Sequence, residues 1–288
     1  MFTTAEQRAL DQLSTSGGRL GVLAADQRTK LVAALESAGL PSGAPAQRSF
    51  KLDLVRSLGG DPPAMLLDPE IGLPYVLDER ALPARTGLLV SLERSGSRRT
   101  GDGLRRAELL PEVGAAGVRR VGGTGAKLLL RLRADREDSD GANARLLRAA
   151  AADCAAHHLL LVVEVLVYRL EDESEGWFAA RRAELIRDGA LLAEAAGARY
   201  LKLEFPGDEA ACRRLTDALP VPWALLSAGV DHDTFVGQLR AALSGGASGF
   251  IAGRSVWKEA VAMPPYERRA FLGGEARRRL AQLLDIVG

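Results

Sequence analysis

The chain has 288 residues, with 38 Lys and Arg against 37 Asp and Glu, three histidines and two cysteines. This near-zero net charge excludes a general electrostatic attraction to nucleic acid or to an anionic membrane. Cys154 and Cys212 are too few and too far apart for a disulfide framework or a thiolate metal site. No signal-peptide pattern opens the sequence, and no apolar run reaches about 18 residues. We therefore expect a globular, cytoplasmic protein.

Eight short apolar runs recur along the chain. Several are rich in Leu and Val at consecutive positions, which is typical of strands buried on both faces of a parallel sheet. The runs span residues 19–26, 64–68, 86–93, 126–132, 159–167, 199–205, 223–229 and 248–254.

Amphipathic segments lie between these runs and are long enough for crossover helices, among them 29–39, 142–158, 178–197 and 232–246. This alternation predicts an α/β fold, a single (β/α)8 TIM barrel formed by residues 1–288 as one domain. An open doubly wound sheet is the alternative. It normally has a glycine-rich phosphate turn after its first strand, where this chain has Ala-Asp-Gln-Arg.

Two further segments have their own patterns. Thr3 and Glu6 form a capping box, which predicts a helix before the first strand. Residues 96–106, GSRRTGDGLRR, are rich in glycine and arginine, so we expect a mobile, basic loop there.

Charged side chains fall within four of the predicted strands. Asp26 ends the first run, Lys127 and Glu164 lie in the fourth and fifth, and Lys202 lies in the sixth. Singly, each has an ordinary explanation, such as a lysine that points outward or an aspartate that caps a helix. Lys127, Glu164 and Lys202 together are costly to bury unless they neutralise one another or are used. Because catalytic groups of barrels come from the C-terminal ends of several strands, we predict one site.

This set of residues permits imine chemistry. A lysine is a nucleophile only as the free amine, which partial burial and a second ammonium group both favour. Lys127 could supply that second charge beside Lys202. An imine on Lys202 would act as an electron sink, and Glu164 is placed to take a proton from a substrate hydroxyl. This is the chemistry of a metal-independent aldolase.

A divalent metal catalyst is not expected. His157 and His158 precede the fifth strand, at the wrong end of the barrel, which leaves only His232. We predict no metal site and no cofactor.

Two glycine-containing turns follow the last two predicted strands. Ser227 and Gly229 come after the seventh, and Gly253 and Arg254 after the eighth. Loops at these places in barrels often bind phosphate through backbone N–H groups, and an arginine adds a bidentate donor. The alternative is that both glycines only permit tight turns. A phosphate, or a mimic such as a sulfonate, is the expected ligand.

The ordered set of motifs resembles the class I tagatose 1,6-bisphosphate aldolase family, whose close relatives cleave sulfofructose 1-phosphate. The resemblance covers nearly the whole chain. It rests on LAADQR (23–28), LLDPEIG (66–72), GLLVSLERSG (87–96), GAKLLLRL (125–132), VVEVLVY (162–168), YLKLEFP (200–206), LSAGV (226–230) and IAGRSVW (251–257).

The resemblance implies roles for individual residues. Lys202 matches the Schiff-base lysine, Glu164 the acid/base carboxylate and Lys127 the lysine beside the imine. Asp26 and Gln27 match residues that reach substrate hydroxyls. The anionic end of the substrate would be held by Ser227, Gly229, Gly253 and Arg254. The resemblance also implies a homo-oligomer, a dimer or a tetramer.

The chain departs from the family at two places. Thr29-Lys30 stands where the family usually has Gly-Ser, and Leu130-Arg131-Leu132-Arg133 stands where it usually has aromatic residues and an aspartate. Arginines close to the expected mouth could be solvated surface residues or could recognise a second anion on the substrate; they are Arg98, Arg99, Arg131 and Arg133.

The leading hypothesis is a lyase that splits a ketose 1-phosphate bearing a second anionic group into dihydroxyacetone phosphate and a three-carbon aldehyde. Glyceraldehyde 3-phosphate is one such aldehyde. Two alternatives stay open. The first is a sulfofructose 1-phosphate aldolase, which would release sulfolactaldehyde. The second is a non-catalytic barrel that binds sugar phosphates and regulates another process.

Overall fold

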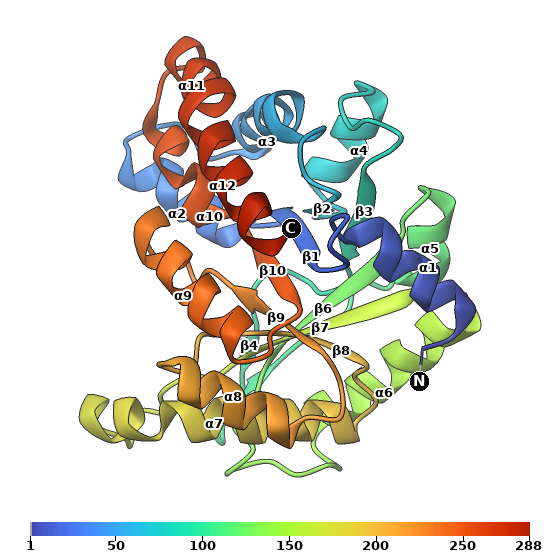
Figure 1. Ribbon diagram of the computed structural model, residues 1–288, viewed down its shortest axis with the longest axis vertical. Helices are drawn as coiled ribbons and strands as arrows, with labels where there is room; N and C mark the ends of the chain where they lie inside the picture. The colour runs from blue at the N-terminus through green and yellow to red at the C-terminus, as the bar shows by residue number, and fades with distance from the viewer. Residues whose placement is uncertain (1) are drawn as a thin grey trace.

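The computed structural model describes residues 2–288, and in these residues eight parallel strands close into a barrel (Figure 1). Their order around the barrel is β1-β10-β9-β8-β7-β6-β3-β2. The predicted barrel is confirmed, and each of the eight apolar runs coincides with one strand, with β6 beginning one residue before its run. The strands are β1 (Leu20–Ala25), β2 (Ala64–Leu67), β3 (Gly87–Ser91), β6 (Gly125–Arg131), β7 (Leu160–Leu166), β8 (Tyr200–Leu203), β9 (Trp223–Leu226) and β10 (Gly249–Ala252).

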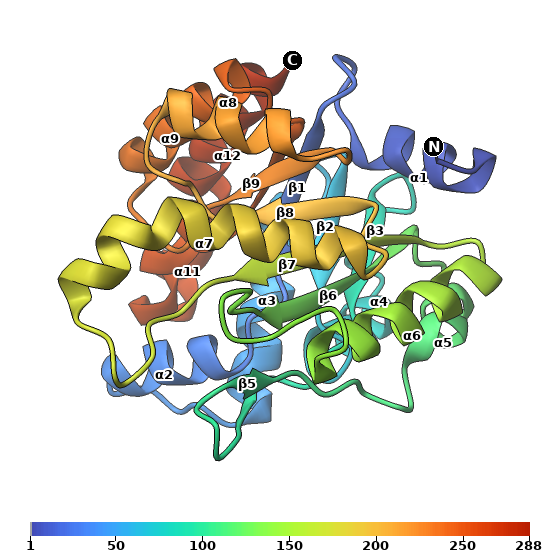
Figure 2. The same ribbon diagram turned by 90° about the horizontal axis from the view of Figure 1, so that it is seen from below.

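Helices alternate with these strands and surround the barrel (Figures 1 and 2). None in the described residues is long and apolar enough to cross a membrane. The α-helices are α1 (Thr4–Leu13), α2 (Thr29–Ser37), α3 (Ala44–Leu58), α4 (Gly72–Asp78), α5 (Gly114–Arg120), α6 (Ala142–Ala156), α7 (Glu175–Ala195), α8 (Glu209–Ala218), α9 (His232–Ser244), α10 (Arg254–Trp257), α11 (Pro265–Phe271) and α12 (Arg277–Val287). A 3-10 helix, η1 (Lys258–Ala262), and a π-helical turn, η2 (Leu272–Ala276), complete the set.

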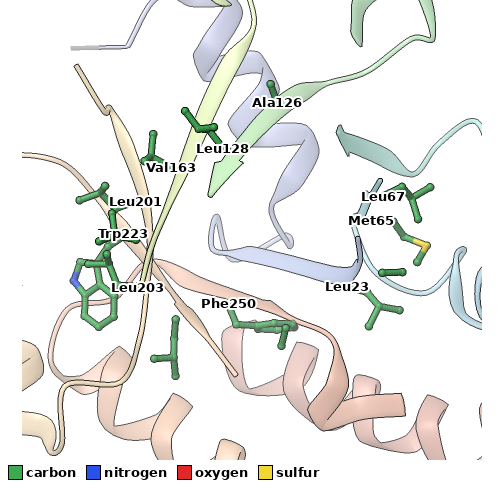
Figure 3. Packing of buried hydrophobic residues seen from close by; sticks show 14 of the residues in the cluster. Leu23, Met65, Leu67, Ala126, Leu128, Val163, Leu201, Leu203, Trp223 and Phe250 are labelled. Atoms are coloured by element: carbon green, nitrogen blue, oxygen red, sulfur yellow. The ribbon is translucent and has the colours of Figure 1, made fainter. Parts of the chain in front are cut away.

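Successive side chains of each strand point alternately to the helices and to the barrel interior. Leu128 and Val163 belong to the outer layer of the core, which packs against the helices (Figure 3). Their chain neighbours Lys127 and Glu164 therefore point inward. Burying the apolar outer layer stabilises the fold by about 25 cal/mol per Å², and the same alternation brings charged groups into the interior.

Helix α1 closes the N-terminal end of the barrel. Thr3 accepts a hydrogen bond from the Glu6 backbone and the Glu6 carboxylate accepts one from the Thr3 backbone, so the predicted capping box is present. Leu10 and Leu13 pack with inward-facing strand residues such as Leu20 and Leu160. With that end filled by apolar side chains, the opposite, C-terminal end is the one left to hold a site.

The basic segment 96–106 is more regular than the sequence predicts. Its arginines form a two-stranded antiparallel hairpin, β4 (Arg98–Arg99) with β5 (Arg105–Arg106). A hydrogen bond of 3.0 Å from the Thr100 N–H to the Leu104 carbonyl supports the turn. The hairpin lies at the end of the barrel away from α1 (Figure 2). The predicted basic loop therefore contains a short hairpin at its arginines.

Candidate active site

An ionic cluster fills the C-terminal end of the barrel interior. The Lys127 ammonium, only 2% exposed, is surrounded by carboxylates, at 2.7 Å from Asp26 Oδ2, 2.6 Å from Glu93 Oε1 and 3.3 Å from Glu164 Oε2. Lys202 Nζ lies 2.8 Å from the same Glu164 oxygen. The three strand residues that the sequence analysis grouped into one site are thus in direct contact through Glu164.

Strand register brings Glu164 and Lys202 together. Glu164 of β7 pairs with Lys202 of β8, and Leu129 of β6 pairs with Glu164 on its other side. Lys127 lies one inward position before Leu129, so its longer side chain reaches up to Glu164. Alternation along neighbouring parallel strands is sufficient to assemble these three groups.

The cluster shifts the pKa values of its members. Burial opposes charge on Asp26, but Lys127, and next Lys202, hold the pKa of this carboxyl well below its usual range. Burial also opposes charge on Glu164, whose pKa Lys202 and Lys127 lower. On Lys127, burial is outweighed by its three carboxylates, which raise the pKa of the ammonium group. Lys127, Asp26 and Glu164 are therefore all charged at neutral pH.

Glu93 is the member of the cluster that the sequence analysis did not identify. It follows β3 and is 4% exposed, with one carboxylate oxygen on Lys127 and the other accepting a 3.1 Å hydrogen bond from the Leu129 N–H. The signal was its position two residues after Ser91, which continues the inward-facing series beyond the end of the strand. Because Glu93 contributes a negative charge to Lys127, the Lys127 ammonium group is not an isolated positive charge beside Lys202.

A second buried ionic pair supports the first from the side of β2. Asp68, which follows β2, forms a salt bridge with Lys51 of α3. Its other carboxylate oxygen accepts the Ile71 N–H at 2.7 Å and holds the start of α4. Lys51 also contributes to the low pKa of Asp26, so this pair belongs to the same electrostatic environment. The motif LLDPEIG (66–72) contains Asp68, but the sequence alone does not predict its pairing with Lys51.

A cavity of about 200 Å³ opens beside the cluster at the C-terminal end of β7, β8, β9 and β10. Six of the predicted site residues line this cavity: Gln27, Glu164, Lys202, Ser227, Gly253 and Arg254. Asp26 and Lys127 adjoin it through Glu164. The structure thus brings all but one of the predicted residues to this cavity or its ionic floor, and the exception, Gly229, contacts Arg254 outside it.

The turn after β9 is shaped around the Arg254 guanidinium. Ala228 and Gly229 both have positive φ angles, 50° and 85°. A Cβ on Gly229 would lie 2.9 Å from Arg254 Cζ, so a larger residue there would displace the guanidinium from this position. Arg254 Nη2 donates a 3.2 Å hydrogen bond to the Ala228 carbonyl. The guanidinium keeps further N–H donors for a ligand.

Gly253 permits a close approach between β10 and β1. A Cβ there would lie 2.2 Å from the Ala24 carbonyl oxygen. That same oxygen accepts a 3.0 Å hydrogen bond from the Trp257 indole, which fixes α10 next to the first strand. The Gly-Arg-x-x-Trp motif therefore brings Arg254 to the rim of the cavity.

Gln27 has an unused hydrogen-bonding group at the cavity. Its Nε2 donates to Asp26 Oδ1 at 3.1 Å, while its Oε1 is buried and has no partner among the described residues. A buried amide oxygen without a partner is costly unless a ligand or water satisfies it. Gln27 is thus prepared to accept a hydrogen bond from a bound molecule.

The histidines lie where the sequence predicts. His157 and His158 precede β7 at the end of the barrel opposite the cluster, and His232 begins α9 with its Nε2 2.9 Å from Gln282 Oε1. Across residues 2–288 no group of three or more His, Cys, Asp and Glu side chains is arranged to hold a metal ion.

The comparisons with known proteins agree with this geometry. A model of the DeoC/LacD family aldolases matches residues 22–259. The chain is 26% identical to tagatose 1,6-diphosphate aldolase 2 of Enterococcus faecalis, with 90% of this chain and 85% of the relative covered. It is 27% identical to tagatose 1,6-diphosphate aldolase 1 of Streptococcus mutans, with 91% and 88% covered.

Solved structures give the same fold. A Schiff-base-forming fructose-1,6-bisphosphate aldolase superposes with a TM-score of 0.65 at 17% identity, covering 98% of this chain and 99% of that one. The barrel fold and the family match together identify the class of protein as an aldolase. This chain belongs to the DeoC/LacD aldolase family, and it is a lyase.

Proposed function

We propose that this enzyme is a metal-independent class I aldolase. It reversibly cleaves a ketose 1-phosphate with a second anionic group into dihydroxyacetone phosphate and a three-carbon aldehyde. The observation that carries the proposal is the buried Lys202 ammonium, 2.8 Å from Glu164 on the wall of a cavity at the barrel mouth. The names of the relatives, tagatose 1,6-diphosphate aldolases, support this substrate class.

Imine formation begins when Lys202 loses a proton. The adjacent Glu164 carboxylate is the nearest acceptor. The free amine attacks the C2 carbonyl of the substrate. The resulting carbinolamine takes that proton back from Glu164 as its hydroxyl leaves as water, which gives a protonated imine on Nζ and restores the Glu164 carboxylate. This positive charge replaces that of the ammonium group, so the ion balance with Glu164 is preserved.

Cleavage then needs a base at the C4 hydroxyl. One oxygen of Glu164, Oε2, is held by Lys202 and Lys127, while Oε1 accepts no hydrogen bond within residues 2–288. Glu164 takes the hydroxyl proton as the C3–C4 electron pair moves to the iminium and forms an enamine, and the aldehyde leaves. Protonation at C3 and hydrolysis release dihydroxyacetone phosphate and restore Lys202.

The other cluster residues support these steps. Lys127 keeps Glu164 ionised and oriented through its 3.3 Å contact. Asp26 and Gln27 bind substrate hydroxyls, with the unpaired Gln27 Oε1 as an acceptor. The 1-phosphate lies at the turns after β9 and β10, where the backbone of Gly229 and Gly253 and the side chains of Ser227 and Arg254 surround an anion.

Residues 1–288 act as one domain in this proposal. Support comes from the two ends of the barrel sequence, since the Gly17 N–H donates a 2.7 Å hydrogen bond to the Gly288 carbonyl and α12 packs against β1. A non-catalytic barrel that only binds sugar phosphates is the competing function, and activity measurements separate the two.

The test uses two variants with a ketose 1,6-bisphosphate as substrate and dihydroxyacetone phosphate as the measured product. Lys202→Met should abolish turnover while the protein stays folded and binds the substrate. Glu164→Gln should lower kcat by about 10² to 10⁴ with a much smaller change in KM. Substantial activity of Lys202→Met, or binding without turnover by the wild type, would exclude the proposed reaction.

A further inference from the structure

Arg131 occupies the last inward-facing position of β6. Lys127, Leu129 and Arg131 alternate with outward-facing leucines, so Arg131 lies on the cavity side, two inward positions beyond Lys127. Its register partner on β7 is Leu166, which lines the cavity next to Glu164. The guanidinium is therefore placed at the mouth, above the proposed catalytic groups.

This guanidinium lacks a counter-ion. Arg131 Nη1 is buried without a hydrogen-bond partner, and no described carboxylate lies within ion-pair distance of the side chain. The nearby Glu204 is already bound by Arg182 at 2.8 Å and by the Val167 N–H at 2.9 Å. Arg131 is half-buried, and its buried Nη1 donor is unfavourable unless a ligand or water accepts its hydrogen bonds.

A second cation stands beside the first. The Asn143 amide donates hydrogen bonds to the carbonyls of both Arg105 and Arg131, at 2.9 and 3.1 Å, so the two residues lie side by side. Arg105 stacks on the Tyr168 ring at 5.5 Å and forms no salt bridge within residues 2–288. Carboxylates act on Arg131 only from beyond ion-pair distance, so the two neighbouring guanidinium groups are available to an anion.

The other arginines near the mouth have partners of their own. Arg133 is fully buried and bound by Glu173 and Asp135, and it stabilises the loop after β7. On the hairpin, Arg98 and Arg99 are exposed and pair with glutamates. Of these four arginines, Arg131 alone combines an inward-facing strand position with a buried donor that has no partner.

The barrel order gives the position of this site relative to the rest of the substrate. β6 and β10 are four strands apart in a ring of eight, so Arg131 lies across the mouth from Arg254. Lys202 on β8 is two strands from each. A ketose whose carbonyl is at Lys202 and whose 1-phosphate is at Arg254 directs its other end toward Arg131.

We propose that Arg131 and Arg105 bind the anionic group at the far end of the ketose, a phosphate or a sulfonate, and that Arg131 determines the preference for doubly anionic substrates. This assignment rests on the proposed function for the orientation of the substrate. It also explains the departure from the family at this position, since an aromatic residue there could not form a charge-assisted bidentate contact.

The experiment compares a ketose 1,6-bisphosphate, a 6-sulfonated ketose 1-phosphate and a ketose 1-phosphate that has no second anion. Arg131→Met should reduce kcat/KM for the preferred double anion relative to the ketose 1-phosphate by about tenfold or more. For Arg131→Lys, the ratio of kcat/KM values should lie between that of the wild type and that of Arg131→Met. Comparison of the phosphate and sulfonate ligands identifies which anion the wild type prefers.

Arg98→Met is the matched control, because it removes an exposed arginine of the neighbouring hairpin. It should leave the substrate ratio unchanged. Arg131→Met should also keep or raise the melting temperature, since it removes an unpaired cation; a large loss of stability would indicate a structural role instead.

Equilibrium binding of the same ligands, measured by calorimetry, tests the anion site independently of turnover. If the wild type binds the bisphosphate more tightly and Arg131→Met abolishes this preference, the anion site is supported. This holds even if no bond is cleaved, and then only the proposed reaction fails. An equal ratio of affinities in wild type and Arg131→Met, or no binding of any of the three, would overturn the inference.

Discussion

The interior of this barrel holds two ammonium groups and three carboxylates in one cluster: Lys127, Lys202, Asp26, Glu93 and Glu164. Each charge was removed from water at a considerable cost, which only close pairing offsets. The cluster therefore lowers the pKa values of Asp26 and Glu164 and raises that of Lys127. Glu164 is thus a carboxylate at neutral pH and can accept a proton.

The effect of the cluster on the pKa of Asp26 can be measured through the pH dependence of the free energy of unfolding. Its pKa is lower in the folded protein, so its contribution is present above its unfolded pKa of about 4 and is lost as the pH falls toward the folded value. Asp26→Asn should lower the free energy of unfolding by about 3 kcal/mol at pH 7. The difference from wild type should shrink below about pH 4. Urea denaturation between pH 7 and pH 3 provides the comparison.

Asp61→Asn serves as the control for the pH series. Asp61 pairs with Arg277 on the surface, and exposed pairs contribute less than about 1 kcal/mol. Its effect should be small at every pH. A difference between wild type and Asp26→Asn that stays constant from pH 7 to pH 3 would contradict the account of the cluster.

The sequence predicts only those residues of the candidate site that stand out individually from their neighbours in the chain. Lys127, Glu164 and Lys202 are conspicuous because each interrupts an apolar run. Glu93 lies beyond the last residue of its strand, where a charged residue is ordinary, so only its place in the inward-facing series distinguishes it. The surroundings of Arg131 and Arg133 depend on the β4–β5 hairpin and on the loops after β6 and β7. Spacing along the chain does not determine which of the two arginines is paired with carboxylates.

At the scale of elements, the turns after β9 and β10 position the anion-binding groups through backbone geometry. Gly253 lies against the Ala24 carbonyl, and the Trp257 indole is hydrogen-bonded to the same oxygen. The first and last strands of the barrel are thereby joined at the cavity rim. A shift of β10 relative to β1 would move Arg254 away from its ligand.

Gly253→Ala should separate these strands, since its Cβ would lie 2.2 Å from the carbonyl oxygen. We expect a loss of stability of about 2 kcal/mol and a rise in KM for the ketose phosphate of about tenfold or more. Calorimetric melting and steady-state kinetics measure the two effects.

Gly237→Ala is the comparison, because Gly237 lies in α9 with no atom within 4 Å of its added Cβ. There the change to alanine should stabilise the helix by about 0.5–1 kcal/mol and leave KM unchanged. If Gly253→Ala behaves like Gly237→Ala, the close approach of β10 to β1 has no role in ligand binding.

At the scale of the whole molecule, the barrel was predictable because its signal repeats. Eight apolar runs separated by amphipathic segments identify the architecture even though the ends of individual strands differ from the runs by one to several residues, as for β8, where the run 199–205 contains the strand Tyr200–Leu203. The hairpin β4–β5 was not predictable, because two-residue strands of arginine carry no hydrophobic alternation.

The central claim is that Lys202 forms an imine with the substrate ketone. The most direct test is borohydride reduction in the presence of dihydroxyacetone phosphate, followed by peptide mass spectrometry. We expect a single reduced adduct on the peptide that carries Lys202 in the wild type, and no adduct in Lys202→Met. An adduct on Lys127 would reverse the assigned roles of the two lysines, and no adduct despite binding by calorimetry would contradict imine catalysis.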